Sequence, residues 1–223
     1  MGAKFEICYL SDKNNRDILV NTLCALFDVG IKYNEYIHGE YSYWIDGPIW
    51  KFGESATVIE QKRKAFKEIG EIDSIINVLS SHFSPTITLG AYWFGKAITL
   101  ILSTCESEEK WNEVKISVDR YEVFDSLKSI EKEKAIVNLR EIFNRTALNL
   151  KPYYGIAATE MMGLASSAEN LQIDNHYLGD FNYFDRSLVL KMQLSDYTND
   201  YVIEELIDGC AFLYKLQGIL DLG

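Results

Sequence analysis

Residues 86–103, with the sequence TITLGAYWFGKAITLILS, decide the fold class of this chain. Two runs rich in β-branched and aromatic residues flank Phe94-Gly95-Lys96, where the glycine permits the tight turn of a β-hairpin. In residues 114–118, apolar side chains then occur at every second position, which is typical of a strand with one buried face. We therefore expect a three-stranded antiparallel meander.

The N-terminal region predicts a strand followed by a helix. Residues 4–10 alternate roughly between apolar and polar side chains, which indicates a strand. In residues 16–28 the leucines recur at helical spacing, Asn14 or Asn15 is a suitable N-cap, and Gly30 is placed to end the helix.

A second helix and strand follow the meander. Residues 129–148 have one apolar stripe and charged side chains elsewhere, so they predict an amphipathic helix with Ser129 as its cap. After Pro152, residues 153–162 predict a strand in which Gly155 permits a bulge or the close approach of another residue. This order indicates an α+β protein: a mainly antiparallel sheet with helices on one face, built from ferredoxin-like elements with additions.

The remaining segments give weaker patterns. We expect one domain over residues 1–223, and a C-terminal subdomain from about residue 164 is the alternative. The expected elements are an irregular or hairpin-like segment at 31–54, helices at 55–69 and 72–83, a loop at 164–185, a strand at 187–194, a short acidic helix at 198–208 and a last strand at 209–220.

The net charge of the chain makes some classes of binding partner unfavourable. The net charge is -11, and residues 151–223 hold 11 acidic and 4 basic residues, against 22 and 18 in residues 1–150. A negative field repels phosphate backbones and anionic lipid headgroups, so we expect neither nucleic acid nor a membrane as partner. A basic protein partner fits this charge, although the acidity also fits a surface that is only solvated.

Motifs for cofactors and metals are absent from the sequence. It contains no GxGxxG, GxxxxGK[ST] or GxSxG pattern, and its three histidines form no HExxH or HxH pair, so we predict no cofactor and no metal. No CxxC pair occurs, and no apolar stretch at the start is typical of a signal peptide. We therefore expect a cytoplasmic protein whose cysteines are buried thiols: Cys8, Cys24, Cys105 and Cys210.

Two segments combine aromatic rings with acidic side chains, and we predict that they bind a protein partner. Large rings supply contact area at binding hot spots, while carboxylates pair with lysines or arginines of the partner. The alternative is that the rings fill a second hydrophobic layer beneath a loop. The candidate residues are Tyr41, Trp44, Trp50, Glu40 and Asp46 in the segment 33–50, and Asp174 and Asp180 in the segment 174–185.

Two other function classes stay open at this point. Glu160, His176 and Asp180 would suit general acid and base catalysis in a hydrolase-type enzyme, if the fold brings them together. Alternatively, the aromatic segments would line the pocket of a small-molecule sensor.

One passage resembles a known class of proteins. An amphipathic helix with Phe143 is followed by Pro152, an aromatic-Gly strand and an acid at Glu160; the matching strand residues are Tyr153, Tyr154 and Gly155. This order resembles immunity proteins of bacterial polymorphic toxin systems, over residues 132–160. The resemblance implies a non-enzymatic, acidic, cytosolic protein that binds a cognate toxin, often a basic nuclease, and blocks it.

Overall fold

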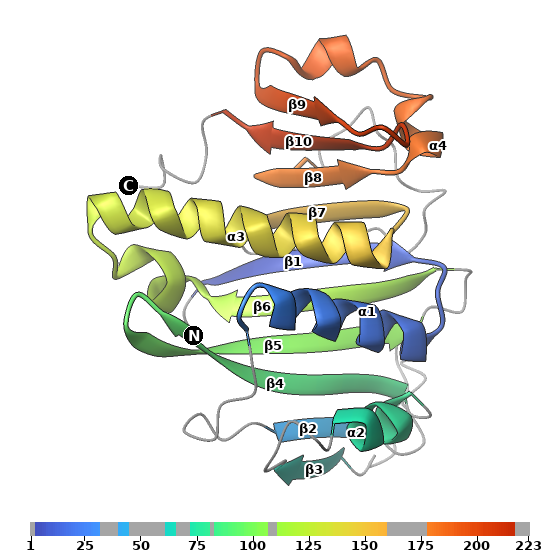
Figure 1. Cartoon of the computed structure of the whole chain (residues 1–223), viewed down its shortest axis with the longest axis vertical. Coiled ribbons are helices and arrows are strands. Elements are labelled where there is room, and N and C mark those ends of the chain that lie inside the picture. The colour runs from blue at the N-terminus through green and yellow to red at the C-terminus, as the bar shows by residue number, and fades with distance from the viewer. Residues whose placement is uncertain are drawn as a thin grey trace, which may run out of the picture.

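One antiparallel sheet organises the computed structural model, which describes residues 3–31, 40–44, 61–65, 72–80, 83–106, 111–159 and 178–216. The sheet has ten strands in the order β3-β2-β4-β5-β6-β1-β7-β8-β10-β9. Helices α1, α2 and α3 lie on the same face of this sheet (Figure 1). The predicted α+β class is therefore confirmed.

The elements have the following bounds: β1 (Lys4–Ser11), α1 (Asn15–Asp28), β2 (Glu40–Trp44), β3 (Gln61–Ala65), α2 (Ile72–Leu79), β4 (Phe83–Trp93), β5 (Lys96–Glu106), β6 (Asn112–Asp119), a π-helix (Tyr121–Asp125), α3 (Ser129–Leu150), β7 (Tyr154–Thr159), β8 (Phe181–Phe184), α4 (Arg186–Val189), a 3₁₀-helix (Leu194–Tyr197), β9 (Tyr201–Glu205) and β10 (Ala211–Lys215).

The predicted meander is present as β4, β5 and β6. Its hairpin closes at the Trp93–Lys96 pair, with Phe94 at φ 49° and Gly95 at φ 78° in the turn. Two consecutive residues of positive φ are the geometry of a tight hairpin turn whose twist matches that of the strands. Here Phe94 occupies a position that glycine or asparagine usually takes.

A ferredoxin-like unit lies within the sheet, as the sequence predicted. Strands β5, β6, β1 and β7 are neighbours in that order, and α1 and α3 follow β1 and β6 in the chain. This is the βαββαβ arrangement. The additions are β2, β3, α2 and β4 between α1 and β5, and β8, β10 and β9 beyond β7.

Two hydrophobic clusters hold the layers together. The larger one lies between the sheet and the helices, where Leu26 of α1 and Phe143 of α3 are buried together with Tyr9 of β1. The smaller cluster contains Leu10 and Tyr154 together with Leu188, Tyr201 and other residues of the C-terminal region. The residues next to Leu10 and Tyr154 in their strands face the helices. Because β-strand side chains alternate between faces, the smaller cluster occupies the opposite face of β1 and β7.

The helix caps agree with the sequence at α1 and differ at α3. The Asn14 side chain accepts a hydrogen bond from the Asp17 N–H, as expected of an N-cap, and Gly30 has the left-handed φ of 87°. At α3, Ser129 is the first helical residue instead of the cap. The Glu131 carboxylate there accepts a hydrogen bond from the Lys128 N–H.

The predicted helix at 55–69 is wrong where the structure describes it. Residues Gln61–Ala65 form β3, which pairs with β2 from Glu40–Ala65 to Trp44–Gln61. Pairing with a distant strand overrides the local helical spacing, because strand formation depends strongly on such context. β3 ends the sheet, and its three consecutive basic residues suit an edge strand.

The helix predicted at 72–83 ends earlier than expected. α2 stops at Leu79, and Phe83 begins β4, so Pro85 lies inside a strand. The register between β2 and β4 shifts at this point, between the pairs Ser42–Thr86 and Trp44–Phe83. An irregular register tolerates proline because no regular ladder hydrogen bond is lost there.

Three predictions in the C-terminal region are wrong. The end of the predicted loop is the strand β8, and the strand predicted at 187–194 is the short helix α4, which the Asp185 carboxylate caps by accepting from the Leu188 N–H. The acidic helix predicted at 198–208 is the strand β9, which forms a hairpin with β10 across a turn with Gly209 at φ 85°. The last predicted strand is confirmed as β10.

Candidate partner-binding cleft

The structure describes only part of the predicted partner-binding surface. Glu40, Tyr41 and Trp44 lie on β2, between β3 and β4. Trp50, Asp46 and Asp174 lie outside the described residues. The predicted surface as a whole therefore stays a prediction.

Asp180 is placed where β7, β8 and β10 meet. Its N–H donates to the Ala157 carbonyl at 2.8 Å, and its own carbonyl accepts from the Lys215 N–H at 2.9 Å. Burial raises the pKa of the Asp180 carboxyl, while the nearby charges of Lys215 and Arg120 lower it. Glu160 and His176 lie outside the described residues, so the proposed catalytic combination of the three stays a prediction.

An open cleft of about 320 Å³ lies on the helical side of the molecule, where α1 ends, β4 ends and α3 passes. This volume is at the small end of the range of ligand pockets, about 300–1,000 Å³. The cleft therefore suits a single side chain better than a large molecule. Its lining residues are Asp28, Val29, Gly30, Ile31, Tyr92, Trp93, Asn138, Glu141 and Ile142.

The end of α1 forms one wall of the cleft. The Gly30 N–H donates to the Phe27 carbonyl at 3.0 Å and the Ile31 N–H donates to the Leu26 carbonyl at 2.9 Å, which closes the helix with a glycine cap. The C-terminus of a helix carries partial negative charge, and the last turn of α1 has no basic residue. The Asp28 carboxylate adds to that negative potential.

β4 and α3 complete the cleft. Trp93 is only 5% exposed, and its indole N–H donates to the Val123 carbonyl at 2.9 Å, which fixes the ring. From α3, Asn138 supplies an amide and Glu141 a second carboxylate. Among the described residues that line the cleft there is no lysine or arginine, so this part of the cleft has the electrostatic character of a site for a cation.

Among the described residues outside the lining, Glu141 has one basic neighbour. Its carboxylate lies 3.6 Å from a guanidinium nitrogen of Arg145, one helical turn further along α3. Both side chains are about half exposed, and exposed pairs of this kind stabilise proteins by only about 0.3–0.5 kcal/mol. Arg145 is therefore a weak competitor for a ligand of the cleft.

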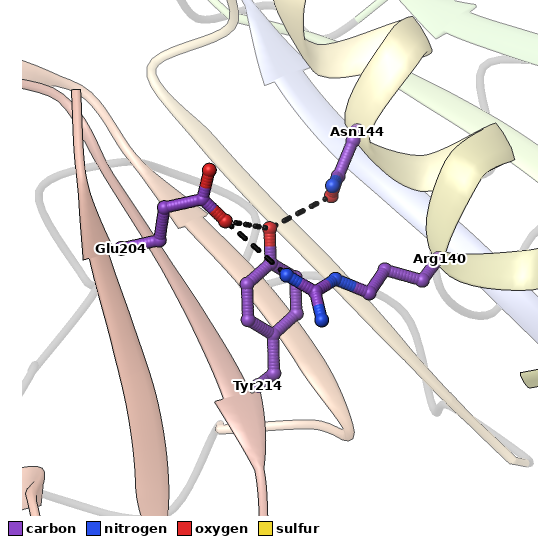
Figure 2. Close-up of polar contacts among 4 residues, drawn as sticks. All are labelled: Arg140, Asn144, Glu204 and Tyr214. Atoms are coloured by element: carbon purple, nitrogen blue, oxygen red, sulfur yellow. Dashed lines mark hydrogen bonds and ion pairs between the residues drawn. The ribbon is translucent and has the colours of Figure 1, made fainter. Parts of the chain in front are cut away.

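A second polar cluster lies on the other side of α3, toward the C-terminal strands (Figure 2). The Arg140 guanidinium lies 3.5 Å from the centre of the Tyr214 ring and 3.2 Å from the Glu204 carboxylate. The Tyr214 hydroxyl lies 3.2 Å from both Asn144 Oδ1 and Glu204 Oε2, so it can donate to either. This cluster ties α3 to β9 and β10, and we assign it a structural role.

Burial in this cluster changes the acidity of Tyr214. Burial raises the pKa of Tyr214 to about 12, and the Arg140 charge acts in the opposite direction. Like an ordinary tyrosine, the phenol is protonated near neutral pH and is available as a hydrogen-bond donor.

Within the described ranges, neither a group of metal-ligating side chains nor a membrane-spanning helix is present. These residues contain no group of three or more histidine, cysteine or carboxylate side chains arranged to hold a metal ion. No helix among them combines the length and the apolar character that crossing a bilayer requires. The prediction of buried cysteines holds for Cys8 and Cys210 but is wrong for Cys24, which is exposed on α1.

The residues that carry the resemblance to immunity proteins have packing roles where they are described. The Phe143 ring stacks on Tyr9 at 5.5 Å, and Tyr154 is buried. Gly155 lies against the Tyr9 ring. Glu160 lies outside the described residues.

Sequence reasoning missed the cleft because its carboxylates come from distant parts of the chain. One local signal was available: Asp28 lies in the last turn of a helix that has no basic residue there. Carboxylates are unfavourable at helix C-termini unless something offsets them, so this position was a candidate for function.

No protein-family model and no curated protein sequence matches the chain. Among solved structures, the T6SS protein PA0821 of Pseudomonas aeruginosa has a similar fold, with a TM-score of 0.53 and 12% sequence identity. The match covers 97% of this chain and 68% of that chain. At this identity the similarity concerns the fold.

Proposed function

We propose that this chain is a non-enzymatic protein that binds a basic toxin and neutralises it, in the manner of an immunity protein. Its fold is similar, over 97% of its length, to that of a T6SS protein. Similarity to a T6SS protein is consistent with a secretion or toxin-system context. This similarity is the observation that most supports the proposal.

Charge gives the proposal independent support. The net charge of -11 favours association with a basic partner, because complementary fields speed the encounter of two proteins. The cleft adds two carboxylates, and the part of its lining that the structure describes holds no basic residue. In this proposal the toxin contacts Tyr41, Trp44 and Trp50, while Glu40, Asp46, Asp174 and Asp180 pair with its basic side chains.

A capture experiment tests the proposed binding. The purified chain is immobilised and incubated with lysate of its source organism at low and at moderate salt, and bound proteins are identified by mass spectrometry. We expect one stoichiometric basic protein whose retention falls as salt rises, because screening weakens the attraction between exposed charges. If a folded bait captures no such protein, the proposal fails.

Trp44→Ala tests the predicted surface on β2. If Trp44 is a hot spot, this variant binds the captured partner more weakly by more than about 1 kcal/mol, measured by calorimetry. Trp111→Ala is the control, because Trp111 packs on Tyr153, with ring centroids 4.6 Å apart, and is not in the predicted surface. Unchanged affinity of a folded Trp44→Ala variant would reject this assignment.

A further inference from the structure

The chain itself shows how it holds a guanidinium group. Around Arg140, one aromatic ring, one carboxylate and one asparagine amide come together: Tyr214 stacks at 3.5 Å, Glu204 pairs at 3.2 Å and Asn144 contacts the tyrosine hydroxyl at 3.2 Å (Figure 2). Arginine suits such a site because its planar group stacks on rings and presents several donors to carboxylates.

The cleft on the other side of α3 presents the same kinds of group without a guanidinium. Tyr92, which is 65% exposed, supplies aromatic surface, Asn138 an amide, and Asp28 and Glu141 carboxylates. Within the described part of the chain, the structure gives Asp28 no hydrogen-bond or ion-pair partner, and Glu141 has only its exposed pair with Arg145. The negative end of α1 lies in the same wall.

From this correspondence we infer that the cleft is a docking site for an arginine side chain of the partner protein. The inference rests on the proposed function, since it names the partner group that this face binds. The cleft volume of about 320 Å³ suits a single side chain, and the carboxylates in its lining suit a cation. Arginine is favoured over lysine because the cleft combines aromatic surface with more than one acceptor.

The surroundings of the cleft suit contact with a protein. Val137, one helical turn before Glu141 on α3, is 63% exposed, and Tyr92 in the lining is 65% exposed. Residues four apart on a helix are neighbours on its surface. An arginine at the centre with apolar contacts around it is a common arrangement at binding hot spots.

A small probe tests the cleft without the toxin. N-acetyl-arginine-N-methylamide is titrated into the isotopically labelled protein, and amide chemical shifts are followed by NMR. N-acetyl-citrulline-N-methylamide is the matched probe, because it has nearly the same shape and no charge. We expect saturable shifts at Gly30, Asn138 and their neighbours with the arginine probe, and much smaller ones with the citrulline probe.

Charge-neutral variants complete the test. Asp28→Asn/Glu141→Gln should weaken binding of the arginine probe about three- to tenfold, as expected for two partly exposed charge contacts. Asp12→Asn/Glu133→Gln changes the net charge equally at exposed positions outside the cleft and should bind the probe like the wild type. Equal shifts with both probes, shifts elsewhere, or equal affinity of the two double variants would overturn the inference.

The same variants separate this inference from the proposed function. If the arginine probe binds in the cleft but no basic toxin is captured, the proposed function fails and the site remains. If a toxin is captured and binds the cleft variant as tightly as the control variant, the docking site is wrong and the proposed function remains.

Discussion

Gly155 marks a point where the sheet has no room for a side chain. A Cβ atom built there would lie 2.6 Å from Cδ1 of Tyr9, on the neighbouring strand β1. The Tyr9 hydroxyl in turn donates to the Phe143 carbonyl of α3 at 2.8 Å. One buried tyrosine therefore connects β1, β7 and α3. The sequence predicted the close approach at Gly155, but the identity of the approaching ring depends on strand pairing.

Gly155→Ala should lower the free energy of unfolding by about 1–3 kcal/mol, because the added methyl group overpacks a rigid core. Urea denaturation measures the change. The double variant Tyr9→Leu/Gly155→Ala is the control: relative to Tyr9→Leu alone, the alanine should cost less, since the ring is gone. An equal cost in both backgrounds would contradict the contact.

The raised pKa of Tyr214 predicts a loss of protein stability at high pH. Its pKa is raised by burial to about 12, above the ordinary value of about 10, so folding favours the protonated phenol. The contribution of this phenol to the free energy of unfolding is fully present below about pH 10 and is lost as the pH rises toward 12. Urea midpoints between pH 9 and 12 should therefore fall, and less steeply in Tyr214→Phe. Burial raises the pKa of Tyr201 to about 12 as well, so part of the slope should persist. An identical slope in the variant would contradict this account.

Elements differ in how far local sequence determines them. The helix α1 was predictable because its cap, its leucine spacing and its terminal glycine all lie within a few residues of one another. The meander was predictable from alternation and a turn. In contrast, β3 and β9 are short strands at the two ends of the sheet, and each pairs with a single neighbour. The charged sequence of β3 gives no local strand pattern, and β9 has only three strand-favouring residues before two glutamates. Pairing with β2 and β10 makes both segments strands.

The junction between α3 and the C-terminal strands gives a prediction at this scale. Arg140→Ala should lower the free energy of unfolding by about 1–2 kcal/mol, because it removes both the ring contact with Tyr214 and the ion pair with Glu204. Arg145→Ala, which removes only the exposed pair with Glu141, should change it by less than about 0.5 kcal/mol. Thermal or urea denaturation of the two variants provides the comparison. Equal effects would show that the cluster does not stabilise the junction.

At the scale of the whole molecule, composition predicted the sign of the partner's charge but not the place where it binds. The acidity is plain from a net charge of -11. The cleft arises only when the sheet brings the end of α1, the end of β4 and the middle of α3 together. Asp28 and Glu141 lie far apart along the chain, so no local sequence pattern connects them. The predicted segment 33–50 contributes β2 to the sheet, and the rest of it lies outside the described residues.

The central claim is that this chain neutralises a toxin by binding it. Its most direct test is growth of bacterial cells that produce the captured partner, alone or together with this chain. The account predicts that the partner alone stops growth and that co-production restores it, while Trp44→Ala and Asp28→Asn/Glu141→Gln restore it less well. Growth arrest that persists although the wild-type chain is folded and abundant would contradict the account.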